Sequence, residues 1–221
     1  MNIFLYEYIH NLIVKLTGDM TLKFLDPKKP LETCQEQSCD NCNVKQEIHC
    51  HFNSNQAQKF LLSVVPAMLV GLIGIFLYNP LLIIIWLVIC FLYFGFIEIR
   101  VMCSHCPHYA ETETKTLKCW ANYGSPKLWK YRPGPMSTLE KIVFILGGLL
   151  IAVYPLLLII LSQNYPILVV YLILIVVCFY YMRTYMCNQC INFACPANRV
   201  DKKVREKFFQ HNPQIRDAWK K

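Results

Sequence analysis

The chain alternates between polar, cysteine-rich segments and two apolar blocks, residues 60–97 and 142–182, which contain no Asp, Glu, Lys, Arg or His. At about 1.5 Å per residue, one helix over either block would be nearly twice the roughly 30 Å of a bilayer core. Each block must therefore turn back, and "LYNPL" at 77–81 and "SQNYP" at 162–166 mark the turns, because a residue before proline disfavours helix. The pattern predicts two hairpins made of four membrane spans, at 60–78, 80–101, 140–161 and 166–186.

Basic residues give these hairpins a predicted orientation. Of the 22 Lys and Arg residues, 6 precede the first block, 7 lie in the central loop 98–141, and 9 lie in the tail from Arg183. Basic residues stay on the cytoplasmic side during insertion, so both termini and the central loop are predicted to be cytoplasmic. The net charge of +8 then matches topology and anionic lipid better than a nucleic-acid surface.

The predicted fold is an all-α integral membrane protein with cytoplasmic cysteine-rich, metal-binding segments. Its segments are an interfacial amphipathic helix (1–25), a cysteine-rich module (26–58), hairpin 1 (59–102), a Cys/His loop (103–139), hairpin 2 (140–186), and a cysteine knuckle with a basic amphipathic tail (187–221). Helix 1–25 is expected either in the membrane interface or on the protein's own cytoplasmic part. The tail's apolar face is expected on the membrane surface or on a soluble partner. Ser137 and Glu140 form a capping box ahead of the third span.

An internal repeat links the two hairpins. "RVMCSHCPHYA" and "TYMCNQCINFA" each follow an apolar block and align without a gap. The repeat predicts a duplicated unit of two spans and a Cys-x-x-Cys knuckle, with the two units related by an axis along the membrane normal. Such an axis brings the two knuckles together at the cytoplasmic surface.

Paired knuckles are a strong metal signal, because four thiolates from two turns complete one tetrahedral set. The simplest predicted site is Cys103, Cys106, Cys187 and Cys190. Cys119 and Cys195 either complete a second site or replace two of those four, and His105 and His108 are weaker candidates. Zinc, a single iron or an iron–sulfur cluster would suit such thiolates, and the Cys-Pro after C-x2-C-x4-C favours a cluster.

The N-terminal module carries a second predicted centre. Its cysteines follow the spacing C-x4-C-x2-C-x7-C, and only the first three match the spacing of plant-type ferredoxins. Spacing leaves open whether a cluster or zinc binds there. The candidate ligands are Cys34, Cys39, Cys42 and Cys50, with His49 and His51 as weaker candidates.

Ten of the 12 cysteines lie in these segments. The reducing cytosol argues against structural disulfides and favours metal or redox chemistry. Cys90 and Cys178, inside the spans, are expected to pack as small apolar residues. The apolar blocks hold no histidine for a b-type haem and no charge for an ion pathway. The catalytic residues are unknown.

These features predict a membrane metalloprotein in which two iron–sulfur centres relay electrons. Its partners would be the bilayer and either a cytoplasmic redox protein or the subunits of a membrane-associated oxidoreductase, with no nucleic acid. One alternative is a zinc-stabilised membrane anchor or assembly platform. The other is a membrane thiol oxidoreductase that uses its Cys-x-x-Cys pairs.

Overall fold

The computed structural model describes residues 29–40 and 42–220, so the predicted helix at 1–25 lies outside the described residues. The described part is helical, and its only β-pairings are two isolated bridges. The α-helices are α2 (Ser54–Tyr78), α3 (Leu82–Leu92), α4 (Glu98–Val101), α5 (Thr138–Leu161), α6 (Tyr165–Tyr181), α7 (Lys202–His211) and α8 (Pro213–Trp219). Two π-helical turns, η1 (Tyr93–Ile97) and η4 (Met182–Met186), and two 3₁₀ turns, η2 (Cys103–His105) and η3 (Pro107–Tyr109), complete the set.

The four predicted spans are confirmed as helices. Within the described residues, four helical stretches are long and apolar enough to cross a membrane: Ser54–Tyr78, Leu82–His105, Thr138–Leu161 and Tyr165–Met186. Large apolar side chains such as Leu62, Phe91 and Phe179 are well exposed on their outer sides. That exposure suits a lipid solvent, in which an apolar surface carries no penalty.

Local signals set where two of these helices begin. The capping box before α5 is confirmed, because Ser137 Oγ accepts from Glu140 N while the Glu140 carboxylate accepts from Ser137 N. Helix α2 starts before the predicted residue 60. Asn53 caps it by accepting a hydrogen bond from Gln56 N, so the polar stretch before the apolar block forms its first turns.

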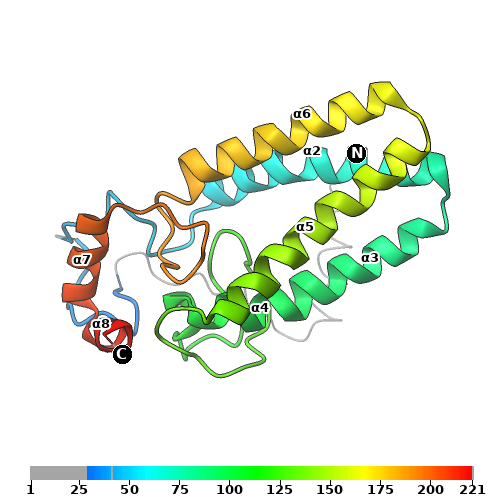
Figure 1. The fold of residues 1–221 in the computed structure, drawn as a ribbon. Coiled ribbons are helices and arrows are strands. Elements are labelled where there is room, and N and C mark those ends of the chain that lie inside the picture. The colour runs from blue at the N-terminus through cyan, green and yellow to red at the C-terminus, as the bar shows by residue number, and fades with distance from the viewer. Residues whose placement is uncertain (1–28, 41, 221) are drawn as a thin grey trace, which may run out of the picture.

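Close packing in the bundle depends on glycine. Helix α2 runs along both α5 and α6, and α3 runs along α5 (Figure 1). A Cβ on Gly74 of α2 would collide with Ile159 of α5, and one on Gly147 of α5 would collide with the Tyr93 ring. Small residues thus let the helices approach closely, as is usual in membrane bundles. The duplication of the hairpins stays a prediction.

Polar side chains within the bundle join neighbouring helices. Trp86 Nε1 donates to the Ile151 carbonyl at 3.1 Å, and Tyr93 Oη donates to the Phe144 carbonyl at 2.7 Å. Pro155 lies four residues after Ile151 and has no N–H, so the helix itself offers Ile151 no donor. The Trp86 indole replaces the missing bond and fastens α3 to α5.

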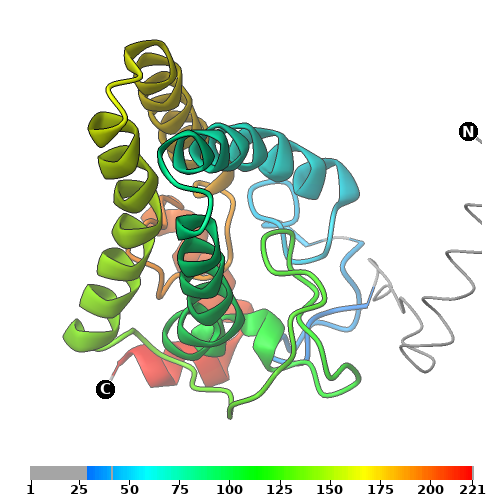
Figure 2. The ribbon, with the colours of Figure 1, turned by 90° about the vertical axis from the view of Figure 1, so that its right-hand side faces the viewer.

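The cysteine-rich segments fold together at one end of the bundle, away from the α2–α3 and α5–α6 turns (Figures 1 and 2). The tail helices α7 and α8 pack there against the N-terminal module. Val204 and Phe208 of α7 share a core with Val44 and Ile48 of that module. The expectation that membrane or a soluble partner covers the apolar face of the tail is therefore corrected: the protein's own module covers it, because that module supplies an apolar face of its own.

Candidate metal centres

The N-terminal thiol group consists of Cys34, Cys39, Cys42 and Cys50. Burial, and after it the neighbouring thiols, raise the pKa of Cys39 and Cys50, and burial also raises the pKa of Cys34. All six pairs among the four thiols interact electrostatically, and Cys34, Cys42 and Cys50 pack against the same apolar core. The structure therefore brings together the four cysteines whose spacing predicted a site.

The second thiol group consists of the six cysteines from the central loop and the C-terminal knuckle. Cys106 interacts with Cys119, Cys190 and Cys195, and Cys190 interacts with Cys119, Cys195 and Cys187. Cys103 interacts with Cys106 and Cys119. The two knuckle segments contact each other through a 3.1 Å hydrogen bond from Asn192 Nδ2 to the Met102 carbonyl.

A central set of four emerges within the second group: Cys106, Cys119, Cys190 and Cys195. For each of these thiols a backbone N–H two or three residues further on lowers the pKa, and for Cys119 this is a hydrogen bond of 3.2 Å from Asn122 N. The other N–H groups belong to His108 for Cys106, Asn192 for Cys190 and Ala197 for Cys195. Such bonds favour the thiolate, whereas burial raises the pKa of all four thiols, that of Cys195 to about 12. Of the alternatives that the sequence left open, the one in which Cys119 and Cys195 replace Cys103 and Cys187 corresponds to this central set.

Cys103 and Cys187 lie at the edge of the central set. Asn122 connects Cys103 to Cys119: its side-chain Nδ2 donates to Cys103 Sγ and its backbone N donates to Cys119 Sγ, both at 3.2 Å. Cys187 interacts with Cys190 and Cys195, and burial raises its pKa while Arg199 lowers it. Asn122 was not identified from the sequence, because a single asparagine carries no motif.

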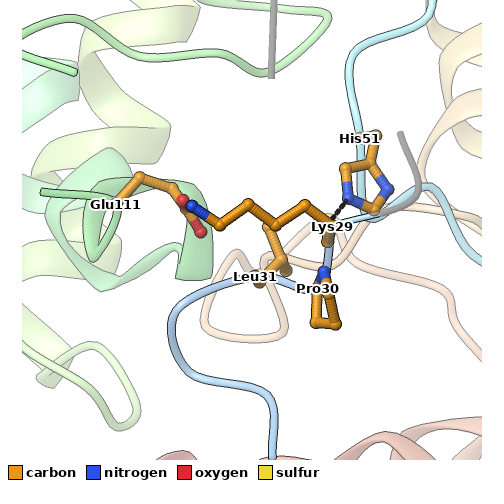
Figure 3. A pocket seen from close by; sticks show the side chains of 5 residues that line it. All are labelled: Lys29, Pro30, Leu31, His51 and Glu111. Carbon is orange, nitrogen blue, oxygen red and sulfur yellow. Dashed lines mark hydrogen bonds between the residues drawn. The ribbon is translucent and has the colours of Figure 1, made fainter. Parts of the chain in front are cut away.

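Three of the four candidate histidines have ring nitrogens directed at protein oxygens. His49 Nε2 hydrogen-bonds Gln189 Oε1 at 2.8 Å, and His105 Nδ1 hydrogen-bonds the Gly134 carbonyl at 3.1 Å. His51 Nε2 donates to the Lys29 carbonyl at 2.8 Å, beside a cleft of about 10 Å³ that is too small for a ligand (Figure 3).

His108 is the fourth candidate. It is buried, and its Nδ1 has no hydrogen-bond partner among the described residues. Burial, with His51 and Lys127 nearby, lowers its pKa to about 3, so the ring is neutral. A neutral imidazole can donate to a metal, so His108, two residues from Cys106 in the chain, stays a candidate ligand beside the thiols.

The two thiol groups share one apolar core. Ile48, Ile191 and Phe193 pack together there, with Cys106 among the buried members and Cys34, Cys42 and Cys50 against the edge. A direct backbone link crosses between the groups: His49 N donates to the Gln189 carbonyl at 2.9 Å, within a parallel bridge of His49 with Cys190. Cys50 follows His49 and Cys190 follows Gln189, so this hydrogen-bonded pair connects one cysteine of each group.

In their present positions, no three or more Cys, His, Asp or Glu side chains of the described residues form a group that could hold a metal ion. Metal binding therefore stays a prediction. The chemistry of the donors fits a bound metal. Buried thiols with raised pKa values stay protonated and inert near neutral pH, whereas a bound metal displaces the proton.

Comparison with known proteins adds no relative: no protein-family model, curated protein or solved structure matches this chain.

Proposed function

We propose that this protein is an integral membrane metalloprotein whose two thiol groups each hold an iron–sulfur centre and relay electrons. The electrons would pass between a cytoplasmic redox partner and the membrane, or within a larger membrane complex. The bilayer anchors the four spans, and the basic, cysteine-rich end faces the cytoplasm. No catalytic residue is assigned.

The observation that carries the proposal is the gathering of ten cysteines into two neighbouring groups at the end of a bundle of four apolar helices, where Cys106 of one group and Cys34, Cys42 and Cys50 of the other contact the same apolar core. Electron transfer between centres needs a short path through protein, and the His49–Gln189 backbone link supplies one between Cys50 and Cys190. Burial and hydrogen bonds to sulfur are the means by which a protein sets a cluster's reduction potential. Both are present around the second group.

The ligand assignment follows the same contacts. Cys34, Cys39, Cys42 and Cys50 would hold the first centre. The central set would hold the second, with Cys103 and Cys187 close by but outside it. When bound, an iron–sulfur group supplies reversible one-electron chemistry. The protein contributes the thiolates, the N–H donors that share their charge, and the apolar core that excludes water.

The first test is the colour and composition of anaerobically purified protein. The proposal predicts brown protein with broad visible absorbance, iron and labile sulfide. Colourless protein with stoichiometric zinc would refute electron relay and support the zinc-stabilised anchor. Colourless, metal-free protein with a reducible dithiol would refute it and support the thiol oxidoreductase.

Serine variants test the ligand assignment. Cys190→Ser is expected to lose the iron of the second centre and keep that of the first, and Cys34→Ser the reverse. Cys187→Ser is expected to retain both, because Cys187 lies outside the central set. Cys178→Ser, in the bundle, is the matched control. Equal iron loss in Cys187→Ser and Cys190→Ser would overturn the central set, and loss of all iron in Cys34→Ser would contradict two independent centres.

A further inference from the structure

A cavity of about 270 Å³ lies where the bundle meets the cysteine-rich end. Its walls come from the first turns of α2, from the end of α6 with the η4 turn, and from the knuckle residue Gln189. Helices α2 and α6 run side by side to this end of the bundle (Figure 1). The η4 wall is a π-helical turn, a feature that is frequent at functional sites.

Gln56 is the polar residue of this cavity that most needs a ligand. Gln56 lines the wall and is only 6% exposed. Neither Nε2 nor Oε1 of its side chain has a hydrogen-bond partner among the described residues. A buried amide without partners costs free energy, so such groups are usually paired. One amide donates and also accepts, so it can pair with a carbonyl or with a hydroxyl.

The opposite wall is aromatic. Tyr181 and Tyr185 line the cavity, and their rings lie 5.1 Å apart at an interplanar angle of 36°. Tyrosines of this kind gather at membrane–water boundaries, where an apolar ring and a polar hydroxyl are both accommodated. Tyr185 is 54% exposed. A flat ring in the cavity would have these two aromatic rings to stack on.

The third wall touches both thiol groups. Gln189 directly precedes Cys190, and His49 directly precedes Cys50. Both residues line the cavity and hydrogen-bond each other through backbone and side chain, at 2.9 and 2.8 Å. A molecule in the cavity would therefore lie one residue away from a cysteine of each group.

We propose that this cavity binds the ring of a membrane-soluble quinone. The proposal rests on the proposed function and names the membrane substrate of the relay. Gln56 would donate to a quinone carbonyl and accept from a quinol hydroxyl. The volume suits a one- or two-ring head whose tail remains in lipid. A lipid phosphate suits it less, because Lys59 is the one Lys or Arg lining the described cavity and neutral amides dominate the rest.

The reaction balances as follows. A quinone becomes a quinol by taking up two electrons and two protons. A cytoplasmic redox partner would supply the electrons, and the two thiol groups would hold the centres that deliver them one at a time. The protons would come from water at the cytoplasmic surface.

The test is binding, measured on the full chain as purified, in phosphatidylcholine nanodiscs. A short-tailed benzoquinone and a short-tailed naphthoquinone are titrated while quenching of intrinsic fluorescence is followed. Saturable binding is expected, weakened about tenfold or more by Gln56→Leu and unchanged by Gln58→Leu, since Gln58 is an exposed glutamine in the same turn of α2. An azidoquinone should cross-link to peptides that contain Tyr181–Gln189 or Asn53–Lys59.

Several outcomes overturn the site: no saturable binding, equal binding by both glutamine variants, cross-links elsewhere, or displacement of the quinone by phosphatidylglycerol. Helix content and elution volume of each variant show that it is folded. The two proposals fail separately. Brown, iron-containing protein that binds no quinone refutes this inference alone, whereas quinone binding by colourless zinc protein refutes the electron relay.

Discussion

Replacing Trp86 by phenylalanine tests how the bundle compensates for a proline inside a membrane helix. The change keeps an aromatic ring but removes the Nε1–H that donates to the Ile151 carbonyl at 3.1 Å. Pro155 cannot serve as the donor, so the carbonyl is left unpaired in an apolar setting. An unsatisfied buried polar group costs about 1–3 kcal/mol, although interhelical hydrogen bonds in membranes average nearer to about 0.6 kcal/mol.

The expected loss of stability for Trp86→Phe is therefore about 1–2 kcal/mol from the hydrogen bond, in addition to the loss from a smaller ring. A double-mutant cycle separates the two terms. Pro155→Ala restores an N–H that can pair with Ile151 within α5, so in that background Trp86→Phe should cost only the packing term.

The assay is reversible unfolding of the protein in mixed micelles as the mole fraction of a denaturing detergent rises, followed by helix content. Each single variant and the double variant are compared with the parent. If Trp86→Phe costs the same free energy in both backgrounds, the indole does not compensate for the proline, and the reasoning is refuted.

Three further predictions follow from individual contacts. Asn122→Ala removes the Nδ2 donor from Cys103 Sγ, which lies outside the central set, so the potential of the second centre should stay within error in a redox titration. Hydrogen bonds to sulfur stabilise the reduced state, so a potential lowered by about 50 mV would show that Cys103 is a ligand and contradict the central set. Gly147→Leu forces a side chain into the Tyr93 ring, and should destabilise the bundle by about 1–3 kcal/mol in the same detergent titration, whereas unchanged stability would contradict the packing of η1 on α5. Phe208→Ala, at a residue 1% exposed, should cost about 3–5 kcal/mol of local stability and release the tail to limited proteolysis, whereas a tail as protected as in the parent would contradict its docking.

The bundle was predictable because its signals are local. The absence of charge over 60–97 and 142–182 fixes the spans, and the capping box at Ser137 fixes the start of α5. The start of α2 was placed too late, because the polar residues Asn53 and Gln56 were assigned to the cysteine-rich module although Asn53 is a helix cap. Gln56 was overlooked for the same reason, since only the folded structure shows that it is buried.

The candidate site was predictable in composition but not in detail. Cys-x-x-Cys spacing brought Cys103 and Cys187 into the predicted site, whereas Cys119, which has no cysteine within three positions, joins the central set only through the path of the loop. The docking of Phe208 could not be predicted, because an apolar helix face does not identify the surface that packs against it. The contact between the two thiol groups depends likewise on the pairing of His49 with Gln189, which are distant in sequence.

Mössbauer spectroscopy of protein produced with enriched iron tests the central claim most directly. The account predicts that essentially all bound iron is sulfur-ligated and tetrahedral, in two populations, one of which disappears in Cys34→Ser and the other in Cys190→Ser. Protein that binds no such iron under anaerobic conditions, or whose iron spectrum is unchanged in both variants, would contradict it.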